Sequence, residues 1–308
     1  MRSKTNTIEI VILRVEQQVI IFHIHLEFID MPEGPEIRKA ADKLVEAIVG
    51  KPLLKIEFGL SHLKEREPEF KDLQVRSIDT FGKAMVTRFE DLNGHQVDLN
   101  IYSHNQLYGR WVCCTADQVP PSNRQLRLGI YTKTDWALLY SASDILVLNN
   151  QEVLDHPFVS KLGKDVLDEE TTLEDVIQKL VSPAYRNRQI GGFLTEQSFF
   201  AGLGNYLRCD ILFVTGIHPA TKAKELSTKK ITDLAKEILR MPRQSYQTDS
   251  ITNDLERVEK LLAQGVRLED ARFWVFRRDG LPCYRCGTKI IKKKTGGQPC
   301  YICESCQK

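Results

Sequence analysis

Residues 283–306 read CYRCGTKIIKKKTGGQPCYICESC, and this stretch decides how the C-terminal part of the chain folds. Cys283 and Cys286 form one C-x2-C pair, Cys303 and Cys306 form a second, and sixteen residues separate the two pairs. Two such pairs at a spacing of roughly 15–20 residues are typical of a zinc site with four thiolate ligands. Four thiolates leave no open coordination position, so the stretch predicts one structural Zn2+ that holds a hairpin rigid.

The chain contains four further cysteines, and the paired ones have alternative interpretations. Disulfides or coincidence are the alternatives for the paired cysteines. Cys300 lies three residues before Cys303 and could compete as a ligand, but we interpret it as a spare thiol. Cys113, Cys114 and Cys209 sit in hydrophobic runs and are interpreted as buried, reduced thiols. Reduced thiols favour a cytoplasmic location.

The same C-terminal stretch is basic. Residues 271–308 carry nine Lys and Arg side chains against two acidic ones, a net charge of +7, whereas the whole chain carries only +2. A small cationic module on a near-neutral body suggests a polyanionic partner. The chain has 308 residues, 42% hydrophobic and 27% charged, which indicates a globular protein of about two domains and excludes collagen-like or wholly disordered classes. No apolar run approaches the ~18 residues of a membrane span, so we expect no integral membrane protein.

Upstream of the cysteine stretch, the pattern changes twice. Apolar residues recur at helical spacing after Pro35, which predicts a leading helix. Short strand-like runs then follow to about residue 150 and predict a β-sandwich or barrel. The expected strands are 53–58, 75–80, 84–89, 96–101, 107–112, 126–131 and 137–140.

After residue 155 the pattern predicts helices. Thr171 and Glu174 suggest a capping box at the start of one helix. A second helix is expected over 189–200, and a third near Asn205. A fourth is expected to begin at Ser227 and to stop before Pro242.

At the other end of the chain, residues 31–36 read Met-Pro-Glu-Gly-Pro-Glu. Within a chain this is an ordinary proline turn, but at a true N-terminus Pro32 would present a free secondary amine. An α-amino group titrates near ~7.7–8.0, so a sizeable fraction would be free base at neutral pH. Such an amine can attack an aldehyde or the C1′ of a sugar and form an iminium. We therefore expect that synthesis begins at Met31 or that residues 1–30, which lack a secretory signal, are removed.

Five motifs occur in a fixed order, and together they resemble the formamidopyrimidine-DNA glycosylase/endonuclease VIII family. The triplet at 106–108 and the run YSASD at 140–144 are most similar to the bacterial endonuclease VIII branch. The motifs are Pro32–Glu36, Gly82–Lys83, Tyr102–Gly109, Gly202–Tyr206 and the C-terminal four-cysteine stretch.

The resemblance implies an α+β multidomain fold in four parts. Residues 1–30 would be an extension absent from the active form. Residues 31–150 would be an N-terminal catalytic β-sandwich domain with the leading helix. Residues 151–262 would be a helix–two-turn–helix DNA-binding domain, and residues 263–308 a four-cysteine zinc-finger hairpin.

The resemblance also implies catalytic roles for four residues. Pro32 would be the Schiff-base nucleophile, and Glu33 the acid/base that assists opening of the deoxyribose. Glu36 would support that site. Lys83 would supply a cation near the scissile phosphate and a proton for elimination.

DNA contacts are implied at further positions. Gln106, Leu107 and Tyr108 would wedge into the gap left by an extruded nucleotide, because a base inside the duplex must be flipped out before chemistry can reach it. Asn205 and Lys161 would each bind a phosphate near the lesion.

The implied activity is removal of oxidised pyrimidines by a bifunctional DNA glycosylase and abasic-site lyase, which cleaves the strand by β- and, if the finger allows, δ-elimination. Its partner would be damaged double-stranded DNA, bound by a monomer away from membranes. Two alternatives stay open. One is a preference for oxidised purines, and the other is a non-catalytic damaged-DNA-binding protein if the Pro32 nitrogen stays blocked.

The sequence departs from the family pattern in the finger. Gln298 stands where the family has an arginine, five residues before the third zinc cysteine. A neutral amide cannot grip phosphate as a guanidinium does, so we expect a weaker DNA contact and a doubtful δ-elimination unless Lys292, Lys293 or Lys294 compensates. Milder departures are Asp210 for glutamate, Lys161 for arginine and Cys300 for an aromatic residue.

Overall fold

The computed structural model describes the backbone of residues 12–15 and 18–21 and the whole of residues 32–308. Strands β1 (Ile12–Val15) and β2 (Gln18–Ile21) form an antiparallel hairpin within a unit that spans Met1–Met31. The rest of the expected extension, residues 1–30, lies outside the described residues. A second compact unit runs from Pro32 to Lys308 and holds every feature discussed below.

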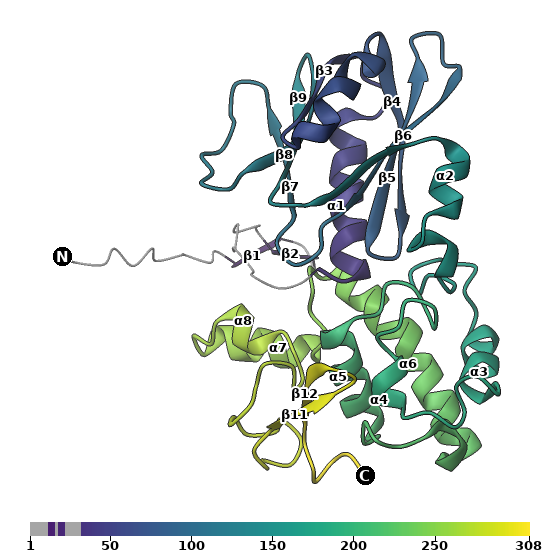
Figure 1. Ribbon diagram of the computed structural model, residues 1–308. Coiled ribbons are helices and arrows are strands. Elements are labelled where there is room, and N and C mark those ends of the chain that lie inside the picture. The colour runs from purple at the N-terminus through teal and green to yellow at the C-terminus, as the bar shows by residue number, and fades with distance from the viewer. Residues whose placement is uncertain (1–11, 16–17, 22–31) are drawn as a thin grey trace. The chain divides into compact units, whose positions relative to one another are not determined.

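The N-terminal half of this second unit is a β-sandwich with a leading helix, as predicted (Figure 1). One antiparallel sheet has the strand order β10-β6-β5-β4, and the other has the order β3-β8-β9-β7. The strands are β3 (Leu53–Phe58), β4 (Leu73–Phe81), β5 (Ala84–Asp91), β6 (Gln96–His104), β7 (Arg110–Thr115), β8 (Leu126–Thr132), β9 (Asp135–Tyr140) and β10 (Asp144–Leu148).

Helix α1 (Gly34–Ile48) supplies part of the sandwich core. Its apolar stripe, Ile37, Ala41, Leu44 and Ile48, is almost completely buried. The helix contacts β4 and β5 of one sheet and β7, β8 and β9 of the other. Burial of each large aliphatic side chain contributes about 1.5–3 kcal/mol, so this stripe fixes the helix between the sheets. The position of α1 in turn decides where Pro32 and Glu33 lie.

Two strand predictions need correction. The strand expected over 107–112 begins at Arg110, because the chain makes a tight turn in which Gly109 N–H bonds to Asn105 O at 2.7 Å. Strand β10 was not expected, and it pairs with β6 at the sheet edge. A 3-10 helix, η1 (Ser61–Phe70), also lay outside the predictions, and its Phe70 ring packs 5.0 Å from that of Phe89.

The C-terminal half is helical, as predicted, but three of the helix predictions need correction. The helix expected to be capped by Thr171 and Glu174 is capped one residue later, by Thr172 with Asp175. The helix expected over 189–200 spans only four residues, because turns replace it from Leu194 onward. The helices are α2 (Asn150–Asp155), η2 (Val159–Lys161), α3 (Leu173–Val181), α4 (Ile190–Phe193), α5 (Asn205–Thr215), η3 (Ala223–Glu225), α6 (Thr228–Gln247), α7 (Leu255–Ala263) and α8 (Leu268–Ala271).

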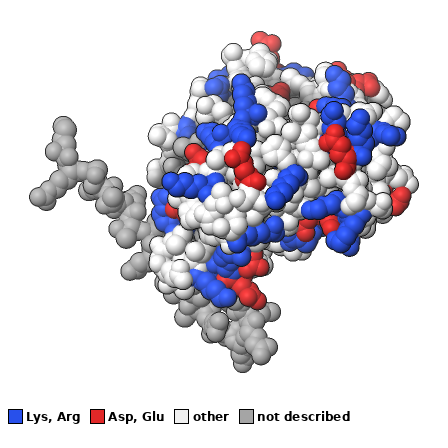
Figure 2. Space-filling view, turned by 90° about the horizontal axis from the view of Figure 1, so that it is seen from below, with Lys and Arg blue, Asp and Glu red and all other residues white. Residues whose placement is uncertain are grey.

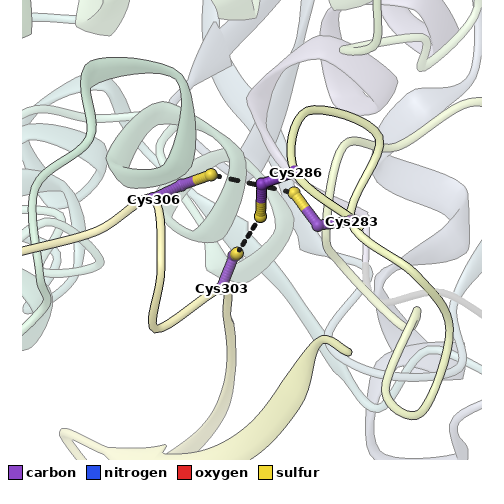
Figure 3. Close-up of side chains that lie close together, drawn as sticks. All are labelled: Cys283, Cys286, Cys303 and Cys306. Atoms are coloured by element: carbon purple, nitrogen blue, oxygen red, sulfur yellow. Dashed lines mark hydrogen bonds between the residues drawn. The ribbon is translucent and has the colours of Figure 1, made fainter. Parts of the chain in front are cut away.

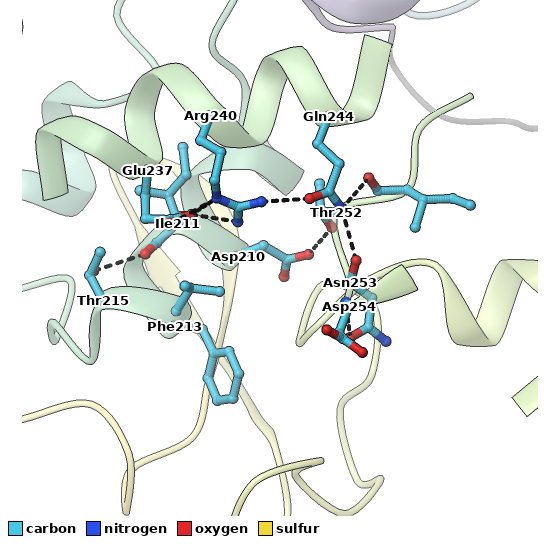
Figure 4. Close-up of polar contacts among 12 residues, drawn as sticks. Asp210, Ile211, Phe213, Thr215, Glu237, Arg240, Gln244, Thr252, Asn253 and Asp254 are labelled. Carbon is cyan, nitrogen blue, oxygen red and sulfur yellow. Dashed lines mark hydrogen bonds and ion pairs between the residues drawn. The ribbon is translucent and has the colours of Figure 1, made fainter. Parts of the chain in front are cut away.

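Helix α6 starts after Ser227 as predicted but continues through Pro242, so the predicted stop is wrong. Proline removes one backbone hydrogen bond of the helix. Side chains after the proline compensate through tertiary contacts, since Gln244 Nε2 donates to Asn253 O at 2.8 Å and to Ile251 O at 3.2 Å (Figure 4). Among the helices that the structure describes, none is long and apolar enough to cross a membrane.

The C-terminal hairpin and the helices share one hydrophobic core. The hairpin consists of strands β11 (Ile291–Thr295) and β12 (Gln298–Ile302). Strand β12 packs against α5, and its Cys300 and Ile302 are buried together with Phe213. The buried Asp210 carboxylate on α5 adds a polar anchor, because it accepts the N–H groups of residues 274 and 275 at 2.9 Å. It also accepts the Thr252 hydroxyl (Figure 4). The hairpin is therefore an integral part of the helical half.

Candidate active site

The residues predicted to act in catalysis meet where α1 begins. Pro32 is half-buried, and the Glu33 side chain is only 3% exposed. The Glu33 N–H donates to Glu36 Oε2 at 2.9 Å, and the backbone N–H of Tyr206, at the start of α5, donates to Glu33 Oε1 at 2.8 Å. Glu33 Oε2 is buried and has no hydrogen-bond partner among the described residues. This oxygen can therefore hold a proton for a substrate group beside Pro32.

The protonation state of Glu33 follows from its surroundings. Burial raises the pKa of Glu33 to about 8; the Lys83 ammonium opposes this shift, and the Glu36 carboxylate adds to it. Burial likewise lowers the pKa of Lys83, while both carboxylates oppose that change. A carboxyl group with such a pKa is largely protonated at neutral pH and can serve as a general acid.

Glu36 connects the start of α1 to three other segments. Its Oε1 accepts the Tyr206 hydroxyl at 2.8 Å and the hydroxyl of Ser250. The Tyr206 hydroxyl also lies 2.8 Å from Ser245 Oγ on α6. Ser245 and Ser250 were not singled out from the sequence, because a lone serine in a polar stretch carries no signal. The network supports the predicted helper role of Glu36.

Two glycine-containing motifs approach each other backbone to backbone at this point. Gly34 N–H donates to Gly202 O at 2.8 Å, and a Cβ on Gly34 would lie 2.6 Å from Gly202 Cα. A Cβ on Gly204 would lie 2.2 Å from the Glu33 carboxyl carbon. Both motifs need glycine because no side chain fits between the two segments. The structure thus brings the N-terminal and the Gly202–Tyr206 motifs together.

Lys83 reaches the site from the β4–β5 turn. Gly82 adopts φ +59°, which glycine tolerates, and an added Cβ there would lie 3.2 Å from Gln197 Oε1. Gln197 in turn holds the segment before α5, since its Oε1 accepts Gly202 N–H at 3.0 Å and its Nε2 donates to Leu203 O at 2.7 Å. Sequence reasoning missed Gln197, which lies beside the turn that carries Lys83 and holds the glycine motif.

The triplet Gln106–Leu107–Tyr108 forms an exposed turn after β6. Leu107 is 45% exposed and Tyr108 is 61% exposed, both unusual for large hydrophobic residues. Gln106 adopts φ +50°, and its N–H donates to His104 Nδ1 at 3.0 Å while its side-chain oxygen accepts the Ser143 hydroxyl at 2.8 Å. A strained turn held from both sides presents two apolar side chains outward, which suits a wedge.

Asn205 is the first residue of α5, and the buried side chain of Arg208 holds it in place. Arg208 is fully buried, and its guanidinium donates to Asn205 Oδ1, to Gly191 O at 3.1 Å, to Thr295 O at 3.1 Å and to Pro299 O at 3.0 Å. Because Arg208 occupies the amide oxygen, the NH2 group of Asn205 is left as a donor. Arg208 was not identified from the sequence, although a charged residue inside a strongly apolar helix is a signal that could have found it.

Two further predicted DNA contacts lie on other segments of the chain. Lys161 is exposed at the end of η2, and the backbone two residues later is joined to the site's supporting loop by a 2.9 Å bond from Gly163 N–H to Gln197 O. Gln298 begins β12 after the Gly296–Gly297 turn, whose residues both have positive φ. The Gln298 side-chain oxygen is buried and unpaired among the described residues.

The three neighbouring lysines of β11 differ in their partners. All three are exposed. Lys293 pairs with Glu304 at 2.6 Å, whereas Lys292 stands over the Tyr301 ring at 5.8 Å. Figure 2 views the molecule from below and shows Lys and Arg side chains spread over much of that face, with Asp and Glu in smaller groups between them. Such a distribution is compatible with a polyanionic ligand.

The four paired cysteines converge into one cluster. The sulfur atoms of Cys283, Cys286, Cys303 and Cys306 all lie within 4.8 Å of one another. The Cys286–Cys303 pair is 3.4 Å apart and the Cys283–Cys306 pair 3.9 Å apart (Figure 3). A tetrahedron with metal–sulfur distances of ~2.3 Å has edges of about 3.8 Å, so the cluster could hold a metal ion.

Comparison with known proteins identifies the same two halves. A family model described as the formamidopyrimidine-DNA glycosylase N-terminal domain matches residues 31–142, and one described as the formamidopyrimidine-DNA glycosylase H2TH domain matches residues 162–256. Endonuclease 8 of Shigella sonnei is 43% identical over 277 residues, which is 90% of this chain and 100% of that protein. Endonuclease 8 of Salmonella typhi is 44% identical over 278 residues, with the same coverage of both chains.

The fold is also similar to that of a solved structure. The complex between Lactococcus lactis Fpg and abasic-site-containing DNA superposes with a TM-score of 0.72 at 21% identity, covering 90% of this chain and 99% of that one. The matched family models, the relatives that align over most of the chain and the motifs that meet at the site all indicate the same family. The chain belongs to the formamidopyrimidine-DNA glycosylase/endonuclease 8 family.

Proposed function

We propose that this protein is a base-excision DNA glycosylase with abasic-site lyase activity that removes oxidised bases from duplex DNA, with oxidised pyrimidines as its main substrates. The single observation that carries the proposal is the buried Glu33 carboxyl beside Pro32. Tyr206 holds one of its oxygens, and the other has no hydrogen-bond partner in the part of the chain that the structure describes. Family membership and the relatives named endonuclease 8 support the reaction class.

The reaction requires a free nitrogen at Pro32. In the chain as written this nitrogen belongs to an amide, which cannot attack a sugar. We infer that the active form begins at Pro32. Three observations support this: the N-terminal family model matches from residue 31, the relatives align over their full length with 90% of the chain, and the second compact unit begins at Pro32.

In the proposed sequence of steps, the Pro32 amine attacks C1′ of the extruded nucleotide, the bond to the damaged base breaks, and the departing base takes up the proton that the Pro32 nitrogen loses. Protonated Glu33 gives its proton to the ring oxygen, which opens the deoxyribose and leaves an iminium on Pro32. Loss of a C2′ proton to solvent sends the C–H electron pair into the iminium and gives an enamine. The enamine returns that pair and expels the 3′ phosphate, which leaves with the electrons of its bond to C3′. Lys83 stabilises the negative charge of that phosphate, and Glu36 keeps Glu33 in place.

The remaining predicted residues would grip DNA. The wedge of Gln106, Leu107 and Tyr108 would fill the space of the flipped nucleotide and offset part of the lost stacking. The NH2 group of Asn205 and the Lys161 ammonium would each bind a phosphate. We assign catalysis to the sandwich of residues 31–150, and DNA binding to the helices of 151–262 together with the hairpin of 263–308.

We propose that the four-cysteine cluster holds one structural Zn2+. The sulfur separations fit a tetrahedral thiolate site, and four protein ligands leave no position for substrate. When bound, zinc supplies folding free energy to a hairpin that has little core of its own. The residues of that hairpin then present Gln298 and the neighbouring lysines to DNA. We further infer a monomer that acts in the cytoplasm, where bacterial DNA lies.

Borohydride trapping tests the proposal. A protein that starts at Pro32 is incubated with duplexes that contain thymine glycol or 8-oxoguanine, and borohydride is added to reduce any imine. We expect a covalent protein–DNA adduct, with more product on thymine glycol. The matched control is the 308-residue chain with Met31 still attached to Pro32, which should not trap. Preferential cleavage of 8-oxoguanine would instead identify an oxidised-purine enzyme, and binding without any adduct would identify a damaged-DNA-binding protein.

A further inference from the structure

Two buried cysteines outside the metal cluster face each other. Cys209 lies on α5 and Cys300 on β12, 91 residues apart in the chain, and their sulfur atoms are 3.8 Å apart. The exposed fractions are 0% for Cys209 and 1% for Cys300. Neither residue takes part in the catalysis or DNA binding proposed above.

The backbones beside the two thiols are locked together. Arg208, directly before Cys209, donates to the carbonyl of Pro299, directly before Cys300, at 3.0 Å. The same guanidinium bonds to Thr295 O across the hairpin. Strand β12 and helix α5 are therefore held together at this point, where the two sulfur atoms lie 3.8 Å apart.

Cys300 is also separate from the metal ligands. The four clustered sulfur atoms belong to Cys283, Cys286, Cys303 and Cys306, and among the described residues the cluster includes no further thiol. Cys300 therefore pairs with Cys209 rather than acting as a substitute ligand. The two thiols are free to react together while the metal ligands remain in place.

We propose that Cys209 and Cys300 are an oxidisable pair that hydrogen peroxide converts into a disulfide, which tethers the C-terminal hairpin covalently to helix α5.

The chemistry balances with peroxide as the oxidant. The Cys300 thiolate attacks one peroxide oxygen, the O–O bond breaks, and after proton uptake the products are a sulfenic acid and water. The Cys209 sulfur then attacks the sulfenic sulfur, its proton leaves with the hydroxyl as a second water, and the S–S bond forms. Two thiols lose two electrons in total, and one peroxide is reduced to two waters.

The surroundings divide these roles between the two cysteines. The Cys209 S–H donates to the Cys300 sulfur, which lowers the pKa of Cys300 to about 7 despite its burial, and the Arg208 guanidinium adds to this effect. Burial raises the pKa of Cys209. Cys300 is thus the nucleophile toward peroxide and Cys209 the resolving thiol.

The disulfide would stabilise the same hairpin that zinc stabilises, and it would do so without the metal. The hairpin is attached to α5 by the shared core, the Arg208 hydrogen bonds and the metal-dependent fold of the hairpin. A covalent bond between β12 and α5 closes a long loop and restricts the unfolded chain. The oxidised protein should therefore keep its hairpin docked even after the metal is removed.

The test uses the full 308-residue protein loaded with zinc. It is titrated with hydrogen peroxide, free thiols are blocked by alkylation, and the non-reduced digest is analysed by mass spectrometry while zinc release is followed in parallel. We expect a cross-linked peptide pair joining Cys209 and Cys300, 2 Da lighter than the two reduced peptides, before zinc is released. A thiol reductant should reverse it. The matched control Cys113→Ala should give the same cross-link, whereas Cys300→Ala and Cys209→Ala should not.

Thermal melting in the presence of a chelator measures the consequence. Peroxide should raise the melting midpoint of the wild-type protein and of Cys113→Ala by about 5–10 °C and leave Cys300→Ala unchanged. The proposal is overturned if zinc leaves before the cross-link forms, or if both thiols stay reduced in the folded protein. Because the cross-link is read by mass, its absence is distinguishable from a failure of the proposed glycosylase function.

Discussion

The backbone N–H of Tyr206 donates to Glu33 Oε1 at 2.8 Å, although the two residues are 173 positions apart in the chain. This bond joins the first turn of α5, in the helical half, to the acid beside Pro32, in the sandwich half. The same tyrosine holds Glu36 through its hydroxyl. The geometry of the proposed catalytic acid therefore depends on how the two halves pack against each other.

The pH dependence of the glycosylase reaction should show two limbs. The Pro32 amine must be unprotonated and Glu33 protonated, so kcat/KM should rise toward pH 8 and fall by about ten-fold per pH unit well above it, given the raised pKa of Glu33 of about 8. Glu33→Gln should lower kcat/KM by about 100-fold and remove the alkaline limb. An unchanged alkaline limb in Glu33→Gln would assign that limb to another group.

Stability against pH gives an independent check on Glu33. Its folded pKa lies above the unfolded value of 4.5, so the proton that it holds stabilises the fold fully below pH 4.5, and this contribution is lost as the pH rises toward 8. The free energy of unfolding of Glu33→Gln should accordingly fall less over this range than that of the wild type, as measured by denaturant titration.

The wedge can be tested by shortening one exposed side chain. Leu107→Ala should reduce single-turnover base removal by about ten-fold or more, because the flipped nucleotide loses its replacement in the stack. The melting temperature should hardly change, since Leu107 is 45% exposed. Leu92→Ala, at a leucine that is 53% exposed in the β5–β6 turn, is the matched control and should leave base removal unaffected.

Arg208 should be a stability residue. Arg208→Ala removes the donor to three backbone carbonyls and to Asn205, so we expect a loss of about 3 kcal/mol or more in the free energy of unfolding. Arg208→Lys should lose less but still lose measurably, because an ammonium cannot reach all four acceptors. Arg188→Ala, which breaks an exposed pair with Glu196, should cost less than about 1 kcal/mol in the same urea titrations.

Restoring the family arginine should change the product distribution. Gln298→Arg is expected to raise the ratio of δ- to β-elimination product several-fold on sequencing gels, because a guanidinium can grip the phosphate bidentately. If Lys294 compensates in the native protein, Lys294→Gln should weaken DNA binding, whereas Lys293→Gln, at a lysine already paired with Glu304, should do so less. An unchanged ratio in Gln298→Arg would show that position 298 does not control the second elimination.

Removal of the metal should affect more than the hairpin. One zinc per chain is expected by elemental analysis, and chelation of the reduced protein should lower the melting temperature and increase proteolysis near residues 283–306. Cys286→Ser should lower the zinc content and reproduce the effect, while Cys113→Ser should leave the zinc content at one per chain. Full stability after complete zinc removal would contradict a structural role.

Local patterns predicted most helices and strands, whereas the residues of the candidate site came from the family resemblance, and their roles stay predictions. The helical stripe of α1 and the spacing of the four cysteines depend on near neighbours in the chain. The helix is confirmed and the four sulfur atoms do come together, whereas zinc binding by them stays a prediction. The path of α6 through Pro242 was not predictable in this way, because tertiary contacts of the residues after the proline outweigh its local preference.

The supporting residues of the site could not be found from one sequence for the same reason. Ser250 and Glu36 are 214 residues apart, and the Ser245 hydroxyl reaches Glu36 through the Tyr206 hydroxyl. Neither serine belongs to a spaced motif. The pairing of Cys209 with Cys300 likewise becomes visible only when α5 and β12 are placed side by side. Chemistry-bearing motifs are local, but the contacts that orient them are not.

The hairpin fills part of the same apolar interior as α5 and α6. A recombinant fragment that ends at residue 263 would consequently not fold as a stable protein that merely lacks the finger. Such a fragment would expose the apolar side of α5 and would leave Asp210 without its backbone amide partners. It should precipitate or be degraded during expression. Swapping fingers between relatives should succeed only when the α5 residues that line that side are transplanted too.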